Sequence, residues 1–117
     1  MNQLNNLAKQ AYNSACKRGI FDKELSINDL LMAIVEEIAE VRKSEMIDCS
    51  DLIIEHGLMT IMLDVPFKRQ FELCIKDSTQ AEFADILIAT LAIMHHLEID
   101  VDLFVELGLR YNSLRSK

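Results

Sequence analysis

The sequence predicts an all-α domain, a bundle of four or five antiparallel helices that oligomerisation completes. Hydrophobic residues make up 50% of the 117 positions and charged residues 26%, which is enough apolar material for a core and excludes a disordered chain. Three glycines and one proline are too few for the turns of a β-sandwich or barrel. The length fits one domain over residues 1–117.

The first half of the chain contains two helical patterns. Leucine and alanine recur every three or four residues over 2–18, which predicts a helix that ends at Gly19. A second helix should begin near Ser26 or Asn28, either of which could cap it. Its apolar stripe continues with intervals of four, three, four and three through Ile27, Leu31, Ile34, Ile38 and Val41.

The middle and the end of the chain are separated by clear capping signals. Gly57 and Pro66 interrupt the middle segment, where short helices are expected around 50–56 and 67–76. Asp77, Ser78 and Thr79 offer caps for a helix that runs to about His96, and Thr79 and Glu82 have the spacing of a capping box. Asp100 can cap a last helix to about Ser113, with Gly108 inside it.

Composition also limits the function. With 12 basic and 19 acidic residues the net charge is −7, which argues against a nucleic-acid binder and means that a phosphate-bearing substrate would need a metal ion or a local cationic cluster. Three cysteines without CxxC spacing indicate reduced thiols and a cytoplasmic protein. The N-terminus lacks a signal-peptide pattern, and the apolar run 83–94 is too short to span a membrane.

Two pairs of carboxylates carry the functional argument. Glu37 and Glu40 lie on the second helix, Glu82 and Asp85 on the fourth, and residues three apart project from the same side of a helix. Because 83–94 is apolar around its circumference, we expect that helix to be buried on most sides and Asp85 with it. A buried acid must be protonated, paired or bound to a cation.

The carboxylate pairs also have an ordinary interpretation. A Glu-x-x-Glu pair is common on solvated helix faces, and Glu82 could simply be a first-turn residue that the helix dipole favours. Two pairs, one of them within an apolar run, favour a site for a hard divalent cation such as Mg²⁺ or Mn²⁺. A ferritin-like di-iron site would show Glu-x-x-His pairs, which the sequence lacks.

At these residues the chain resembles the MazG-like nucleotide pyrophosphohydrolases of the all-α NTP pyrophosphatase superfamily. That family carries Glu-x-x-Glu on one helix and Glu-x-x-Asp on a later one, and this chain matches it at 36–40 and 82–88. The likeness continues at 97–100, which is similar to the family's Gly-Ile-Asp turn, and at 111–115, which is similar to its Tyr-Asn-x-x-Arg.

The resemblance implies hydrolysis of nucleoside triphosphates to the monophosphate and pyrophosphate, as house-cleaning of the nucleotide pool. Members use Mg²⁺, so Glu37, Glu40, Glu82 and Asp85 would be the metal-binding and catalytic residues, with Mg²⁺ or Mn²⁺ as cofactor. A water activated by the metal would attack the α-phosphorus.

The resemblance also assigns the substrate end of the site. Asn112 would hydrogen-bond phosphate or sugar oxygens, and Arg115 would stabilise charge on the leaving pyrophosphate. Tyr111 would either stack on a base or serve as a core tyrosine. A departure is Gly108, which stands where the family often has lysine, so that either Arg110 or Lys76 substitutes for it or the affinity for phosphate is low.

The sequence leaves alternatives open. Within the enzymes, a dUTPase-type or phosphoribosyl-ATP pyrophosphatase relative fits the same residues. From another class, a non-catalytic helical interaction module with vestigial carboxylates is supported by Gly108 and the short tail after Arg115. A homodimer or homotetramer is expected in either case, because few helices are available to cover 83–94 and because members of the family assemble this way.

Overall fold

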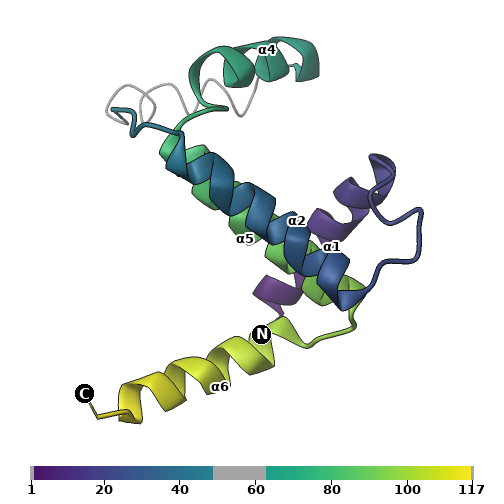
Figure 1. Cartoon of the computed structure of the whole chain (residues 1–117), viewed down its shortest axis with the longest axis vertical. Coiled ribbons are helices and arrows are strands. Elements are labelled where there is room, and N and C mark those ends of the chain that lie inside the picture. The colour runs from purple at the N-terminus through teal and green to yellow at the C-terminus, as the bar shows by residue number, and fades with distance from the viewer. Residues whose placement is uncertain (1, 49–62, 117) are drawn as a thin grey trace. The chain divides into compact units, whose positions relative to one another are not determined.

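The computed structural model describes residues 2–48 and 63–116. The secondary structure of this part of the chain consists of helices, without a strand, which confirms the all-α prediction (Figure 1). The helix expected at 50–56 lies outside the described residues, as do Gly57 and Cys49. The five described helices are α1 (Gln3–Lys17), α2 (Ile27–Arg42), α4 (Asp64–Cys74), α5 (Thr79–His96) and α6 (Val101–Leu114).

The chain divides into two compact units. The terminal unit consists of Met1–Ile34 and Leu87–Lys117, and the central unit of Val35–Ile86. Both α2 and α5 pass from one unit into the other, so each unit holds a part of each. The expectation of a single domain stays a prediction.

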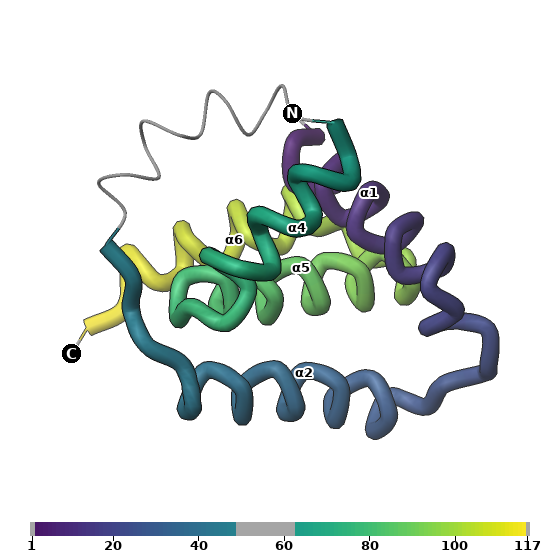
Figure 2. Tube along the Cα trace, turned by 90° about the horizontal axis from the view of Figure 1, so that it is seen from above, coloured from purple at the N-terminus to yellow at the C-terminus, as the bar shows by residue number. Residues whose placement is uncertain are grey.

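Small residues build the core of the terminal unit. Ala8, Ala11 and Ala15 are buried on one side of α1, at the helical spacing that predicted this element. They pack against Leu91, Ala92 and Val101 where α1 crosses the end of α5 (Figure 2). Alanine lets helices approach closely, which is why a stripe of modest hydrophobicity suffices here.

Polar side chains fix the start of α1 against the start of α6. The Asp102 carboxylate accepts hydrogen bonds from the backbone N–H groups of Leu4 (3.1 Å) and Asn5 (3.0 Å), two donors that have no acceptor within α1. The Asn5 amide donates to Asp100 Oδ1 (2.9 Å), and its oxygen accepts from Val101 N (2.8 Å). These contacts between residues almost 100 positions apart hold the two ends of the terminal unit together.

Two of the predicted helix caps form in the terminal unit. Ser26 caps α2, since its Oγ accepts from the Asp29 N–H (3.1 Å). In return the Asp29 carboxylate accepts from Ser26 N (3.0 Å) and from the Ser26 hydroxyl (2.9 Å), and these two hydrogen bonds to the carboxylate lower the pKa of Asp29. Asn28 therefore lies inside the helix. Asp100 caps α6 through a hydrogen bond from Leu103 N (3.2 Å).

In the central unit the end of α2 is joined to the start of α5. Ser44 Oγ and Thr79 Oγ1 lie 2.8 Å apart, and Thr79 N donates to the Glu45 carbonyl (2.9 Å) beside an isolated parallel bridge between Glu45 and Ser78. The predicted capping box at Thr79 is wrong. Ser78 caps α5 instead, because its Oγ accepts from Ala81 N (3.2 Å) and the Thr79 hydroxyl is turned to Ser44.

Helix α4 begins earlier than expected, at Asp64 rather than 67. Pro66 was expected to interrupt the chain, but it lies in the first turn of α4, where a missing N–H costs no helical hydrogen bond. The helix has no buried residue among those described. It is thus a solvated element of the central unit.

The prediction that α5 is buried on most sides is wrong for the single chain. Phe83 and Leu87 are each 58% exposed and Ile88 is 46% exposed. Hydrophobic composition around a helix does not by itself supply neighbours, and in the described residues this side of α5 has few. No described helix is long and apolar enough to cross a membrane.

Candidate metal centre

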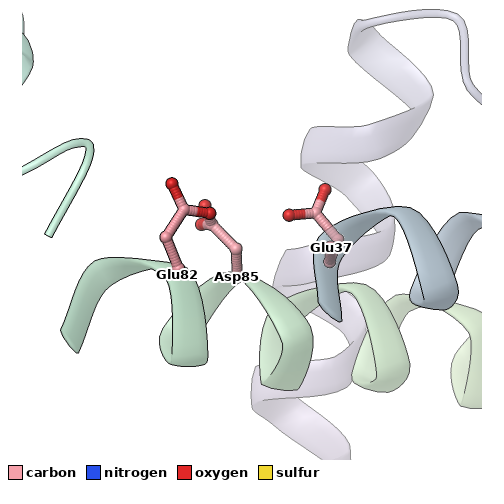
Figure 3. A group of neighbouring side chains, drawn as sticks. All are labelled: Glu37, Glu82 and Asp85. Carbon is pink, nitrogen blue, oxygen red and sulfur yellow. The ribbon is translucent and has the colours of Figure 1, made fainter. Parts of the chain in front are cut away.

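Three carboxylates from two helices meet in the central unit. Glu37 comes from α2, and Glu82 and Asp85 come from α5 (Figure 3). One oxygen of each side chain lies within 4.8 Å of the others. The Glu37 carboxylate points toward the other two across the space between the helices (Figure 3).

Local structure explains this meeting. Glu82 and Asp85 are three residues apart on the first two turns of α5, so they project from the same side of the helix. The contact of Ser44 with Thr79 (2.8 Å) fixes the end of α2 against the start of α5. From this contact the two helices run antiparallel, which brings Glu37, two turns back along α2, level with Glu82 and Asp85.

The burial within the group differs from the prediction. Asp85 was expected to be the buried acid, but it is exposed, and Glu82 is the buried one with 8% of its surface accessible. Glu37 is half-buried. Glu82 belongs to the buried start of α5, together with Ser78 and Ala81. From Phe83 onward this helix has an exposed side, and Asp85 lies on it.

The environment raises the pKa of Glu82 above its ordinary value of 4.5. Burial is the largest cause, followed by the negative charges of Asp85, Glu40, Glu37 and Asp77. The N-terminus of α5 acts in the opposite direction, because the helix dipole favours an anion in the first turn. Desolvation and like charges disfavour the ionised form of Glu82, and a positive charge nearby would relieve this.

Glu40 belongs to the surroundings of the group. It is exposed on α2, and its charge helps to raise the pKa of Glu82, but it is not among the three side chains whose oxygens lie mutually within 4.8 Å. Asp77 has the same electrostatic effect, although the sequence indicated only a capping role for it. Asp77 directly precedes the Ser78 cap at the start of α5, and this position is the sequence signal that it lies near Glu82.

The donor set determines which cofactor it can hold. Carboxylate oxygens are hard ligands that suit Mg²⁺ or Mn²⁺, whereas zinc sites usually include histidine or cysteine. A divalent cation among these oxygens would offset the repulsion that raises the pKa of Glu82. The residues therefore fit a magnesium- or manganese-type ion.

The predicted substrate residues lie together at the end of α6, in the terminal unit, where Arg115 directly follows the helix. The Arg115 guanidinium donates to Asn112 Oδ1 (3.3 Å), and its carbon lies 5.8 Å from the centre of the Tyr111 ring. Tyr111 is 65% exposed, so the interpretation as a core tyrosine does not hold in the single chain. The three side chains thus form one exposed cluster at the end of α6.

No family model matches the chain, and no curated protein or solved structure matches it either. A functional assignment must therefore be argued from the carboxylate group, its charge and its surroundings.

Proposed function

We propose that the chain is a MazG-like nucleotide pyrophosphohydrolase, which converts a nucleoside triphosphate and water to the monophosphate and pyrophosphate with Mg²⁺ or Mn²⁺. The observation that carries the proposal is the convergence of Glu37, Glu82 and Asp85 within 4.8 Å, with Glu82 buried. The resemblance of 36–40, 82–88 and 111–115 to the family's motifs supplies the substrate class.

The residues have distinct parts in this proposal. Glu37, Glu82 and Asp85 hold the cation, and Glu40 joins them or keeps the site negative from its exposed position. The cation, when bound, would polarise phosphoryl oxygens and make hydroxide accessible near neutral pH. Arg115 binds phosphate oxygens, and Asn112, which accepts a hydrogen bond from its guanidinium, holds that side chain in place.

The cation is necessary on electrostatic grounds. The chain carries a net charge of −7, and the candidate site itself gathers carboxylates. A triphosphate would be repelled from these oxygens unless a divalent ion lay between them. The proposed enzyme is therefore inactive in the presence of a chelator.

An assembly of two or four copies is part of the proposal. Exposed apolar side chains on α5 and α6, among them Phe83, Leu87, Phe104 and Leu107, support it, because exposed groups of this kind mark surfaces that become covered. A homodimer or homotetramer would also complete the helical bundle.

The decisive experiment measures pyrophosphate release from a panel of canonical and modified (d)NTPs, including dUTP and phosphoribosyl-ATP. We expect turnover with Mg²⁺ or Mn²⁺, none with EDTA, and a loss of at least roughly 100-fold in Glu37→Gln, the scale of removing a metal-supporting residue. Glu72→Gln is the matched control, because Glu72 is an exposed carboxylate of the same unit whose contact with Lys68 is long, at 4.0 Å.

Two results would contradict the proposal. Absence of turnover on every substrate, with both metals, would favour the non-catalytic interaction module. Equal losses in Glu37→Gln and Glu72→Gln would show that the carboxylate group has no special part. A preference for dUTP or phosphoribosyl-ATP within the panel would instead identify the branch of the enzyme class.

A further inference from the structure

A pocket of about 660 Å³ lies entirely within the terminal unit. It is bounded by the first three turns of α1, the end of α5 and the connection to α6, and Glu37, Glu82 and Asp85 do not line it. This volume is within the range of sites for small organic molecules. The pocket is thus a candidate binding site apart from the carboxylate group.

One wall of the pocket is a polar side of α1. Asn2, Asn5, Asn6, Lys9 and Tyr12 follow one another at intervals of three, one, three and three, so they lie on one side of the helix. The Asn5 carboxamide is already engaged, since it bonds to Asp100 (2.9 Å) and Val101 (2.8 Å) and fixes this wall against α6. The carboxamide of Asn6 is exposed beside it.

Aromatic and imidazole rings continue the lining of the pocket from Tyr12 to the end of α5. Tyr12, His95 and His96 line the pocket, and the Tyr12 ring centre lies 4.9 Å from that of His95 and 6.0 Å from that of His96. Phe21 supports them from behind, with its ring stacked on His96 at 4.5 Å and 5.0 Å from Tyr12. The three rings that line the pocket, each in contact with at least one other ring, make a ring wall that a flat ligand can pack against.

The charged side chains that line the pocket have a negative net charge. Lys9, Glu98 and Asp100 are the charged residues among those that line it. Hydrogen bonds from Asn5 and Leu103 lower the pKa of Asp100, so that it stays ionised at neutral pH. Among the lining side chains one ammonium thus stands against two carboxylates, which does not favour a phosphate or another anion.

We propose that this pocket binds an uncharged planar nitrogen heterocycle, a nucleobase or its nucleoside. The carboxamide of Asn6 offers a donor and an acceptor side by side, which matches the hydrogen-bonding edge of such a ring. The ring wall of Tyr12, His95 and His96 accommodates its face. Binding requires no divalent cation, and it goes beyond the hydrolytic activity proposed above.

The test is NMR titration of the histidine ring protons in EDTA. The chain has three histidines, so His95→Gln and His96→Gln assign the two that line the pocket. The probes are adenosine, cytidine, their free bases, their monophosphates, and ribose. We expect saturable shifts of the His95 and His96 signals with the nucleosides and bases, and weaker binding of the monophosphates because Glu98 and Asp100 repel them.

Substitutions locate the ligand. Asn6→Ala should weaken nucleoside binding about tenfold, the usual scale for one lost hydrogen bond. Asn13→Ala is the matched control, since Asn13 is exposed on the same helix and is not among the lining residues that the structure describes. The Glu82→Gln variant should bind nucleosides as the wild type does.

Several outcomes would overturn the proposal. These are the absence of saturable shifts with every base and nucleoside, tighter binding of AMP than of adenosine, competition by ribose alone, and equal losses in Asn6→Ala and Asn13→Ala. Loss of binding in Glu82→Gln would assign the ligand to the carboxylate group and also contradict it. Because no metal and no turnover enter the measurement, the result is independent of the proposed hydrolase activity.

Discussion

At the scale of single residues, Glu82 links folding to pH. Its pKa is raised above 4.5 by burial and by Asp85, Glu40, Glu37 and Asp77, so the folded state binds its proton more tightly than the unfolded state does. The stability that this proton contributes is fully present below pH 4.5 and is lost as the pH rises through the folded-state pKa. Metal-free protein should therefore lose stability over this range.

Glu82→Gln tests this directly. In EDTA at pH 7 the free energy of unfolding of the variant should exceed that of the wild type by about 1 kcal/mol, a typical size for one substitution. Its stability should vary less with pH above 4.5. Urea unfolding at several pH values measures both effects, and a variant less stable than the wild type at pH 7 would mean that the Glu82 carboxylate makes favourable contacts that outweigh the repulsion.

A divalent metal ion should make the wild type more stable than Glu82→Gln, the reverse of the order expected in EDTA. A ligand that binds only the folded state stabilises it by roughly 2.7 kcal/mol at 100 times its dissociation constant. Millimolar Mg²⁺ or Mn²⁺ should thus raise the melting temperature of the wild type and leave that of Glu82→Gln unchanged. Identical curves with metal and with EDTA would remove the metal from the proposal.

Arg115 allows a test of the substrate end that leaves the fold intact. Its side chain is exposed at the end of α6, where it contacts Asn112 and Tyr111. Arg115→Ala should reduce kcat/KM for the nucleotide by about 100-fold while the free energy of unfolding changes by under about 0.5 kcal/mol. Arg115→Lys should restore only part of the rate, because an ammonium lacks the bidentate fork. Wild-type kinetics in Arg115→Ala would make the match at 111–115 coincidental.

At the scale of helices, capping and spacing predicted most of what forms. Ser26 and Asp100 cap α2 and α6, and the alanines of α1 are buried at their expected intervals. The choice of Ser78 over Thr79 could not be read from the sequence, because it depends on Ser44, 35 residues away, which engages the Thr79 hydroxyl. Pro66 indicates an interruption when the sequence is taken alone, but the first turn of a helix tolerates proline. Helix α4 therefore starts at Asp64, before the position that the sequence predicts.

The two described glycines give opposite predictions for their elements. Gly108 lies inside α6 with nothing within 4 Å of an added Cβ, so Gly108→Ala should stabilise the protein by about 0.5–1 kcal/mol through lower backbone entropy of the unfolded chain. Gly19 has φ +77° and an added Cβ would lie 3.0 Å from Asp22 Oδ2. Gly19→Ala should therefore cost about 1–2 kcal/mol. Denaturant unfolding checks both, and a destabilised Gly108→Ala would indicate that another copy packs closely against α6.

At the scale of the whole molecule, composition and spacing predicted an all-α fold and a candidate site in which three of the four named carboxylates come together, but not their burial. Asp85 lies within the apolar run 83–94 and Glu82 directly before it, yet Glu82 is the covered one, because burial depends on what packs there. The apolar circumference of α5 predicted neighbours that the described part of the single chain does not provide. Sequence patterns thus identify faces that need partners without identifying the partner.

The exposed side of α6 gives this last point a test. Leu103, Phe104, Leu107, Tyr111 and Leu114 are each 45% or more exposed and fall within one stripe of the helix. Such a stripe is the kind of surface that a second copy would cover, so sedimentation velocity should report a dimer or tetramer of the 13.4 kDa chain at micromolar concentration. Leu107→Lys should shift it toward the monomer, because a buried ammonium without a partner opposes association. Ser113→Lys adds the same charge on the polar flank of α6 and should leave the assembly unchanged. A wild-type protein that remains monomeric at 100 micromolar would contradict the expected oligomer.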